Sequence, residues 1–195
     1  MVKYAYISRE VKVPLDEGVS FKLEGKQLEI TGPRGTVGRD FRHAKNIQLS
    51  VVNEDTIAIS AKLPKRKELA LVGTLEGHIK NMISGVTKGF TYKLKIVYSH
   101  FPITVKVNKK SNNVEIQNFI GERGHRVVPI RGDVNIKTTK EDVIIEGSDK
   151  ELVGQNAANI QLKCKIKDKD LRIFQDGIYV YEKLVGDQVF WKVKT

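Results

Sequence analysis

The chain changes its hydrophobic spacing twice, each time in the same order. In the first half, β-branched and other apolar residues alternate with polar ones in short runs at 19–23, 28–30, 47–51 and 57–59. Apolar residues then recur three and four positions apart from Leu69 to Val86. Alternation keeps one face of a strand apolar, whereas the wider spacing keeps one face of a helix apolar. The sequence therefore predicts strands followed by a helix over 67–84, which ends at Gly85.

The second half repeats this order. Alternating runs at 103–107, 113–116, 134–136 and 143–145 precede Ser148 and Glu151, which are spaced as a capping box. In such a box the serine accepts from the third helical N–H and the glutamate reaches back. The inner face of the predicted helix consists of Leu152, Val153, Ala157, Ile160 and Cys164.

Short matches between the halves indicate that one domain has been duplicated. Lys67-Glu68-Leu69 corresponds to Lys150-Glu151-Leu152, and Gly35 corresponds to Gly121, roughly 85 residues apart. Such a period is far longer than that of solenoid repeats. The predicted fold class is α+β, with two tandem similar domains that each pack an antiparallel sheet against one helix. We place them at 1–88 and 89–183, followed by a C-terminal tail at 184–195.

The charge of the chain favours a polyanionic partner. Its 34 Lys and Arg residues outnumber 23 Asp and Glu residues, which gives a net charge of +11. A positive field of this kind attracts phosphate-bearing ligands. The excess divides nearly evenly between the halves, so it belongs to folded surface rather than to a basic tail. With no apolar run near 18 residues and no signal-peptide pattern, we expect a cytoplasmic protein.

The most cationic stretch lies near the end of the chain. It surrounds a small apolar set with Lys165, Lys167, Lys169, Arg172 and Lys183. Within it, Asp176-Gly177 is typical of a chain reversal, because aspartate tolerates unusual backbone angles and glycine accepts a positive φ. A strand over 178–181 is predicted to follow.

A second basic segment lies at 119–131. Arg123, His125 and Arg126 stand between glycines in a predicted loop, and Arg131 follows closely. Guanidinium groups bind two phosphate oxygens at once. A solvated hairpin tip is the alternative, but the clustering favours RNA contact.

No constellation in the sequence indicates catalysis. The segment 32–38 lacks the Gly-Lys-Ser/Thr ending of a phosphate loop and is typical of a hairpin turn. Four histidines and the single Cys164 have no zinc-like spacing. Cys164 is expected to be a small buried apolar residue. We therefore predict no enzyme activity, metal, cofactor, small-molecule substrate or membrane partner.

Aromatic residues could stack on unpaired bases, and the candidates are Tyr4, Tyr92, Tyr98, Tyr179 and Tyr181. An alternating strand buries about half of its side chains, however, and no consecutive aromatic RNA-binding motif is present. The sequence therefore favours recognition of RNA backbone and shape.

The C-terminal stretch resembles the closing signature of the L6 family of large-subunit ribosomal proteins, in its archaeal and eukaryotic branch. The matching residues are Ile166, Lys169, Arg172, Phe174, Asp176-Gly177-Ile178-Tyr179-Val180 and Lys183. Further similar segments lie at 32–36, 66–70, 78–83, 99–103 and 118–122. One position departs from the pattern, because Leu162 stands where the family is expected to carry Gln.

The resemblance implies two similar domains and a structural role in the large ribosomal subunit. It implies binding of large-subunit ribosomal RNA near the translation-factor-binding side and the sarcin-ricin loop, beside neighbouring ribosomal proteins. On the residues, we expect the second domain to bind RNA through 119–131 and 163–183. Two other classes stay open: an RNA-binding regulator or chaperone off the ribosome, and a basic module for acidic proteins or membranes.

Overall fold

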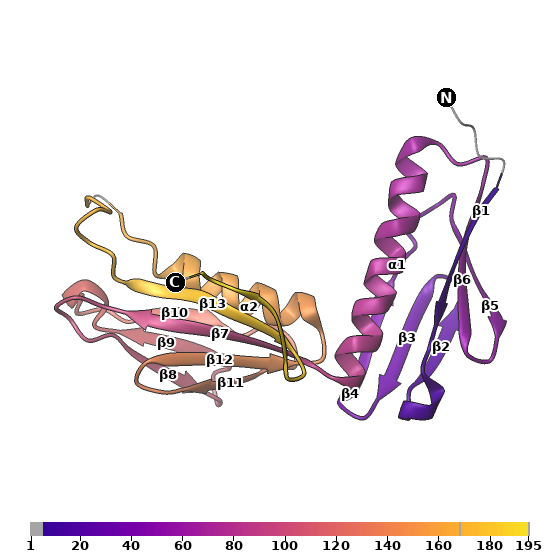
Figure 1. Cartoon of the computed structure of the whole chain (residues 1–195). Coiled ribbons are helices and arrows are strands. Elements are labelled where there is room, and N and C mark those ends of the chain that lie inside the picture. Colours follow the sequence, from indigo (N-terminus) through magenta and orange to yellow (C-terminus); the bar gives the residue numbers. More distant parts are fainter. Residues whose placement is uncertain (1–5, 168, 195) are drawn as a thin grey trace. The chain divides into compact units, whose positions relative to one another are not determined.

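The computed structural model describes residues 6–167 and 169–194 and divides the chain into two compact units. The first ends at Lys88 and the second begins at Gly89. Figure 1 shows that each unit places one long helix against strands. The α+β class and its tandem arrangement are confirmed.

The first unit contains two three-stranded antiparallel sheets, ordered β1-β6-β5 and β2-β3-β4. Its elements, in chain order, are β1 (Tyr6–Lys12), a 3-10 turn η1 (Leu15–Glu17), β2 (Ser20–Glu24), β3 (Gln27–Gly32), β4 (Gly35–Asp40), β5 (Gln48–Asn53), β6 (Thr56–Lys62) and α1 (Arg66–Thr87). The helix packs on β1, β3, β4 and β6. It thereby joins the two sheets into one core.

The predicted end of the first helix at Gly85 was wrong. The helix continues to Thr87, and both Gly85 and Val86 lie on its buried face. One glycine in a helix costs about 1 kcal/mol, less than the roughly 1.5–3 kcal/mol typical of fully burying a valine side chain. The left-handed glycine that follows the helix is Gly89, at φ 76°.

The second unit contains a five-stranded sheet ordered β11-β12-β7-β13-β14 and a three-stranded sheet ordered β10-β9-β8. Its elements are β7 (Phe90–Val97), β8 (Thr104–Asn108), β9 (Asn113–Gln117), a 3-10 turn η2 (Phe119–Gly121), β10 (Arg126–Pro129), β11 (Asn135–Thr138), β12 (Asp142–Gly147), α2 (Lys150–Lys163), β13 (Gly177–Val185) and β14 (Gln188–Lys192). The helix packs on β7, β12, β13 and β10. Alternate residues of β7 are buried beneath it, beginning at Phe90.

The cap of the second helix is Asp149 rather than Ser148. The Asp149 carboxylate accepts a hydrogen bond of 2.8 Å from the backbone N–H of Glu151. The helix begins at Lys150, which places Ser148 one residue too early to be the cap. Serine and aspartate are both favoured at the N-cap, so the residue at which the helix begins decides which of the two is the cap.

Matching strand orders show that the two units share one plan. In the first unit β6, the strand before the helix, lies between the opening strand β1 and β5, the strand that comes before β6 in the chain. The second unit repeats this arrangement as β7-β12-β11. Each unit adds a separate three-stranded meander, β2-β3-β4 or β8-β9-β10. The duplication seen in the sequence therefore reaches the level of strand pairing.

The second unit extends into the segment set apart as a tail. β13 runs to Val185, beyond the predicted limit of 183, and β14 pairs with it in antiparallel register. Gly186 turns the chain at φ 57°, and its N–H donates to the carbonyl of Gly89. Residues 184–192 therefore complete the sheet.

We predict that residues 1–88 and 89–195 each fold when expressed separately, because each unit buries its own core. Amide NMR spectra of both fragments should be dispersed. A fragment starting at 92 lacks Phe90, which is almost fully buried, and should lose about 3 kcal/mol or more of unfolding free energy. Collapsed spectra for both complete fragments would contradict the division.

Candidate nucleic-acid interface

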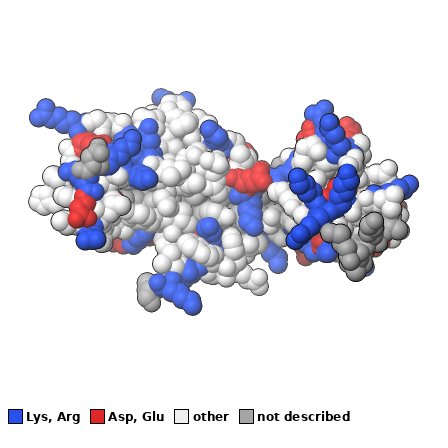
Figure 2. All heavy atoms as spheres, turned by 90° about the horizontal axis from the view of Figure 1, so that it is seen from above, with Lys and Arg blue, Asp and Glu red and all other residues white. Residues whose placement is uncertain are grey.

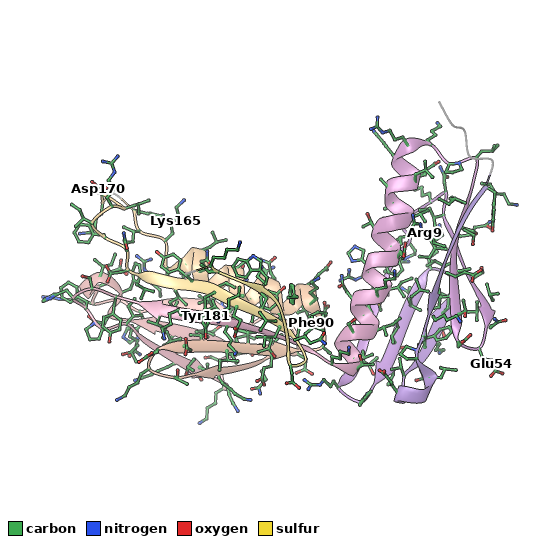
Figure 3. All side chains as sticks on the ribbon, in the orientation of Figure 1. Arg9, Glu54, Phe90, Lys165, Asp170 and Tyr181 are labelled. Atoms are coloured by element: carbon green, nitrogen blue, oxygen red, sulfur yellow. The ribbon has the colours of Figure 1, made fainter. Side chains whose placement is uncertain are left out.

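The residues between α2 and β13 form an exposed loop with anchored ends. We call 164–176 the basic loop. Cys164 and Ile166 are buried at its start, and Asp176 is buried at its end. Between these anchors the exposed cations are Lys165, Lys167, Lys169 and Arg172. Figure 3 shows the loop projecting from the second unit, with Lys165 near its base and Asp170 at its tip.

The tip of the basic loop is organised around Asp170. Its carboxylate accepts from the N–H of Arg172 at 2.9 Å, and its carbonyl accepts from the N–H groups of Ile173 and Phe174. The ammonium of Lys169 lies 4.7 Å from the centre of the half-buried Phe174 ring. These contacts organise the tip of the loop, where Lys169 and Arg172 are exposed.

The tip also exposes two large apolar side chains. Leu171 is 61% exposed and Ile173 is 71% exposed. They alternate with Arg172, so cationic and apolar groups are presented together. Adjacent exposed apolar groups of this size mark contact surfaces when they form a patch.

The Asp176-Gly177 pair does not act as the predicted turn. Gly177 has no positive φ and begins β13 directly. A Cβ at this position would lie 2.7 Å from the Tyr179 ring, so a larger residue would have to displace that ring. The Asp176 carboxylate instead accepts from the N–H of Ser99 at 2.9 Å, which ties the end of the basic loop to the segment after β7.

Arg126, one of the predicted RNA-binding residues, is bound within the protein. It opens β10 rather than standing in a loop. Its guanidinium donates to the Glu122 carboxylate at 2.8 and 2.5 Å and to the backbone carbonyls of Lys163 at 2.6 Å and Lys165 at 3.4 Å. It also lies 4.1 Å from the centre of the Phe119 ring. We call this set of contacts the Arg126 latch.

The Arg126 latch changes the ionisation of its carboxylate. The hydrogen bond from the Arg126 guanidinium lowers the pKa of Glu122 below its usual value, and the same bond raises the pKa of Arg126. Burial raises the pKa of the neighbouring Cys164 thiol to about 12. The thiol therefore stays protonated, which agrees with the predicted apolar role.

The remaining cations of the 119–131 segment are exposed. Arg123 and His125 follow a backbone turn in which Asn118, Ile120 and Gly121 all have positive φ. A positive φ is strained for a β-branched residue such as Ile120. The loop that carries Arg123 therefore begins at a strained backbone turn.

The backbone of Arg131 is fixed by a buried asparagine. The Asn156 side chain accepts from the Arg131 N–H at 2.9 Å and donates to the Arg131 carbonyl at 2.8 Å. Gly132 follows at φ 68°, where an added Cβ would collide with Leu152. The Arg131 side chain itself stays exposed.

Lys163 belongs to the predicted 163–183 segment but was not among the individual candidates, and it joins Arg131 at an open hollow. The hollow measures about 320 Å³ and lies between β10 and the last turn of α2. Leu162, the position that departs from the family pattern, is also part of its wall. The position of Lys163 in the last helical turn was the available signal, because cations are favoured there.

The structure brings most of the predicted cations to one end of the second unit, but not Lys183. Figure 2 shows Lys and Arg side chains gathered over the end from which the basic loop projects. Lys183 instead lies on the sheet, between the rings of Tyr92 and Trp191. Tyr4, one of the aromatic candidates, falls outside the described residues.

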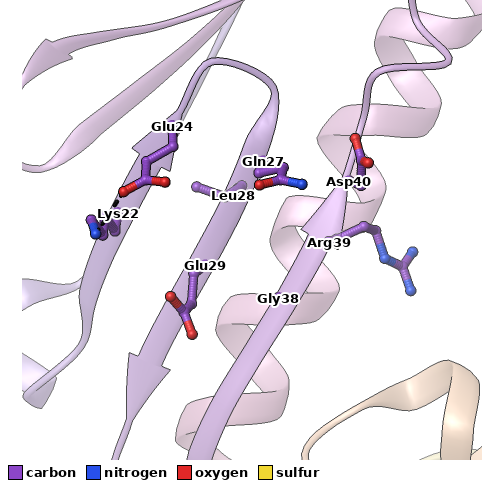
Figure 4. Close-up of a pocket in the computed structure, with 8 residues that line it drawn as sticks. All are labelled: Lys22, Glu24, Gln27, Leu28, Glu29, Gly38, Arg39 and Asp40. Carbon is purple, nitrogen blue, oxygen red and sulfur yellow. Dashed lines mark ion pairs between the residues drawn. The ribbon is translucent and has the colours of Figure 1, made fainter.

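The first unit has a hollow of its own with a different character. It measures about 350 Å³ on the β2-β3-β4 sheet. Figure 4 shows Lys22, Glu24, Glu29 and Asp40 around it. Lys22 pairs with Glu24 at 2.6 Å. Acidic and basic groups alternate here, so the hollow lacks the single sign of charge that phosphate binding requires.

The described residues lack two other features that would point to a different role. Among them, no group of three His, Cys, Asp or Glu side chains is arranged to hold a metal ion. No helix in the described part of the chain is long and apolar enough to cross a membrane.

Comparison with known proteins identifies relatives. The family model of ribosomal protein L6 matches the chain twice, at residues 15–89 and 101–177. Large ribosomal subunit protein uL6 of Staphylothermus marinus is 49% identical over 93% of this chain and 97% of its own length. The uL6 protein of Ignicoccus hospitalis is 48% identical over 95% and 99%. That of Aeropyrum pernix is 45% identical over 95% and 99%.

The Arg126 latch predicts a stability effect. Arg126→Gln should lower the unfolding free energy of the second unit by about 1–2 kcal/mol, because charge-assisted hydrogen bonds are lost in a partly exposed setting. Urea unfolding followed by the fluorescence of Trp191, the single tryptophan, reports on this unit. Arg123→Gln is the control, since it removes the same charge from an exposed position and should change stability by less than about 0.5 kcal/mol. Equal unfolding curves for both variants would contradict the latch.

The Arg126 latch also predicts how the difference in unfolding free energy between the wild type and Arg126→Gln depends on pH. The Glu122 carboxyl has a lower pKa in the folded than in the unfolded state. Its contribution is therefore complete above the ordinary value of 4.5 and is lost as the pH falls through the folded pKa. The stability difference between the wild type and Arg126→Gln should narrow below that pH. A difference that stays constant through this range would exclude a role for the carboxylate.

Proposed function

Because the chain belongs to the ribosomal protein L6 family, we propose that it binds ribosomal RNA of the large subunit mainly through its second unit. It is a structural ribosomal protein and not an enzyme. Membership of this family implies that its partners are ribosomal RNA and neighbouring ribosomal proteins. The protein would meet the RNA near the translation-factor-binding side of the subunit, as the resemblance implies.

The basic loop carries this proposal. Among the described residues, no ion pair or hydrogen bond engages the side-chain heads of Lys165, Lys167 or Arg172. A long cationic side chain with no internal partner keeps its full charge available for phosphate. The anchored ends reduce the entropy lost when the loop binds.

The neighbouring 119–131 segment adds to this surface. Arg126 joins the segment to the start of the basic loop through the carbonyls of Lys163 and Lys165. Arg123 therefore belongs to the same end of the unit as the loop. We assign Arg123, His125, Arg131, Lys165, Lys167, Lys169 and Arg172 to direct RNA contact. Arg126 acts as a positioning residue.

The exposed apolar residues of the loop tip support a partner that covers it. A phosphate backbone alone would satisfy the cations but not Leu171 and Ile173. Sugars and unpaired bases offer apolar surface beside phosphates. A folded RNA therefore fits the mixed chemistry better than an acidic protein tail does.

We predict that affinity for RNA depends on where charge is removed. Changing Arg123, Lys165, Lys167 and Arg172 together to Gln should lower the slope of log affinity against log salt by up to about 3, because each phosphate contact contributes about 0.7–0.9. Binding is measured across a salt series with deproteinised large-subunit RNA of Staphylothermus marinus, the organism of the 49% identical relative.

The matched control removes the same number and kinds of charge from the first unit. The control residues are exposed there: Arg34, Lys62, Arg66 and Lys67. This variant should change the slope much less. Equal slopes in the two variants would show that bulk charge drives binding, as a basic module for acidic partners requires, and would overturn the proposed surface.

A further inference from the structure

A groove in the second unit arises because one helix is narrower than the sheet it covers. A helix with its side chains is about 10 Å wide, whereas five strands at about 4.8 Å spacing span roughly 19 Å between the outer strands. The helix α2 packs on β7, β12 and β13. β14 lies at the edge of the sheet, next to β13. All five of its residues are exposed.

Strand register places three side chains in one row across this open part. Tyr92 of β7 pairs with Lys183 of β13, and Lys183 pairs with Trp191 of β14. Tyr92 also pairs with the buried Ile145 of β12. The row therefore runs from the core beneath α2 outward to the edge strand.

The groove lies between this row and the helix. It measures about 400 Å³, and its walls include Tyr92, Lys183, Trp191, Leu162 and the small helical residues Gly154 and Ala158. An added Cβ at Gly154 would already touch the Tyr92 ring, at 3.6 Å. The small residues of α2 thus leave room beside the aromatic row. None of the described residues that line the groove is acidic.

The aromatic rings lie beside ammonium groups. Lys183 Nζ is 4.7 Å from the centre of the Trp191 ring and 5.2 Å from that of Tyr92. A register shift between Lys183 and Leu184 also brings Phe190 to 6.4 Å from Tyr92. Lys150 Nζ lies 5.5 Å from the Phe190 ring. Trp191 is 41% exposed and Phe190 is 47% exposed, so part of each side chain is accessible to solvent.

We propose that this groove binds an unpaired nucleobase of the large-subunit RNA, stacked on Trp191, with the Lys183 ammonium beside its phosphate. The inference rests on the proposed function. A stacking ring beside a cation is the arrangement with which proteins hold single-stranded nucleic acid. An apolar peptide would use the rings but would place no anion beside the Lys183 ammonium.

The groove is continuous with the cationic end of the unit. Leu162 belongs to both the groove and the hollow that Arg131 and Lys163 line. The Gln161 side chain accepts from the N–H of Val180 at 3.1 Å, which joins α2 to β13 where the groove begins. An RNA strand whose phosphates meet the basic end therefore reaches the groove along α2.

The chain supplies its own reporter, because Trp191 is its single tryptophan. The full chain is titrated with a single-stranded RNA decamer and with an abasic ribose-phosphate chain of the same length. Stacking predicts that the decamer quenches tryptophan fluorescence and that the abasic chain does not. Equal quenching by both would overturn the proposal, since it would report phosphate binding alone.

Ala158→Leu tests the groove without changing charge. Position 158 is exposed on α2, and leucine is a good helix former, so the unit should keep its fold while the groove is filled. The decamer should no longer quench Trp191 in this variant. Full quenching would overturn the proposal.

Binding to deproteinised large-subunit RNA gives an independent measurement. Trp191→Ala should weaken affinity by about 5- to 100-fold, with an unchanged salt slope, because no charge is removed. Trp191→Phe keeps a stacking ring and should restore most of the affinity. Val189→Ala, on the same strand but outside the groove walls, should bind as the wild type does. Thermal unfolding of each variant checks its fold. If Trp191→Ala proves unstable, the quenching measured with Ala158→Leu tests the groove instead.

The outcomes separate this inference from the proposed function. If Trp191→Ala binds RNA as the wild type does while the four-residue variant of the basic surface has a lower salt slope, only the groove inference fails. If the wild-type chain does not bind large-subunit RNA, the proposed function fails. If Trp191→Ala leaves RNA binding unchanged but abolishes self-association in sedimentation, β14 is a protein contact and the inference is wrong.

Discussion

The Arg126 guanidinium makes a cationic surface possible at the end of α2. The last carbonyls of a helix carry a partial negative charge and lack partners within the helix. Left open, they would repel phosphates at the point where the basic loop begins. Arg126 donates to the carbonyl of Lys163, the last residue of the helix, and to that of Lys165 in the basic loop, and it is held in place by Glu122. One charge is thus bound internally so that Lys165, Lys167 and Arg172 can face outward.

The two units share a plan but differ in the path of the chain after the helix. After α1 the chain leaves the first unit, which keeps three-stranded sheets beneath a helix of 22 residues. After α2, which has 14 residues, the chain returns through the basic loop and adds β13 and β14. The added strands widen the sheet beyond the reach of its helix. Both the loop and the groove therefore result from the same extension, which the first unit lacks.

The sequence predicted the strands, the helices and the duplication, but it misplaced a helix end at Gly85, a cap at Ser148 and a turn at Asp176-Gly177. It also missed contacts between distant residues. Strands followed from alternation, as at Val143 and Ile145, and helices followed from apolar residues three and four positions apart, because burial of one face is imposed residue by residue. The partners of Arg126 could not be assigned, since Lys163 lies 37 positions away and an arginine looks the same in a sequence whether it is free or bound. Trp191 was missed for a similar reason. Only strand register places it in one row with Lys183 and Tyr92.

Long-range and short-range forces act at different places on this unit. In the proposed function, the cations of the basic loop would attract RNA across several ångströms, and salt would screen that attraction over about 8 Å at physiological ionic strength. Stacking acts only on contact and releases no counterions, so salt changes it little.

Leu162, 66% exposed, stands between the cationic hollow and the groove and belongs to both. A leucine there offers apolar contact at the boundary, where the glutamine expected from the family would offer a hydrogen bond. The loop would thus set how fast and how salt-sensitively RNA arrives, and the groove would set how long it stays.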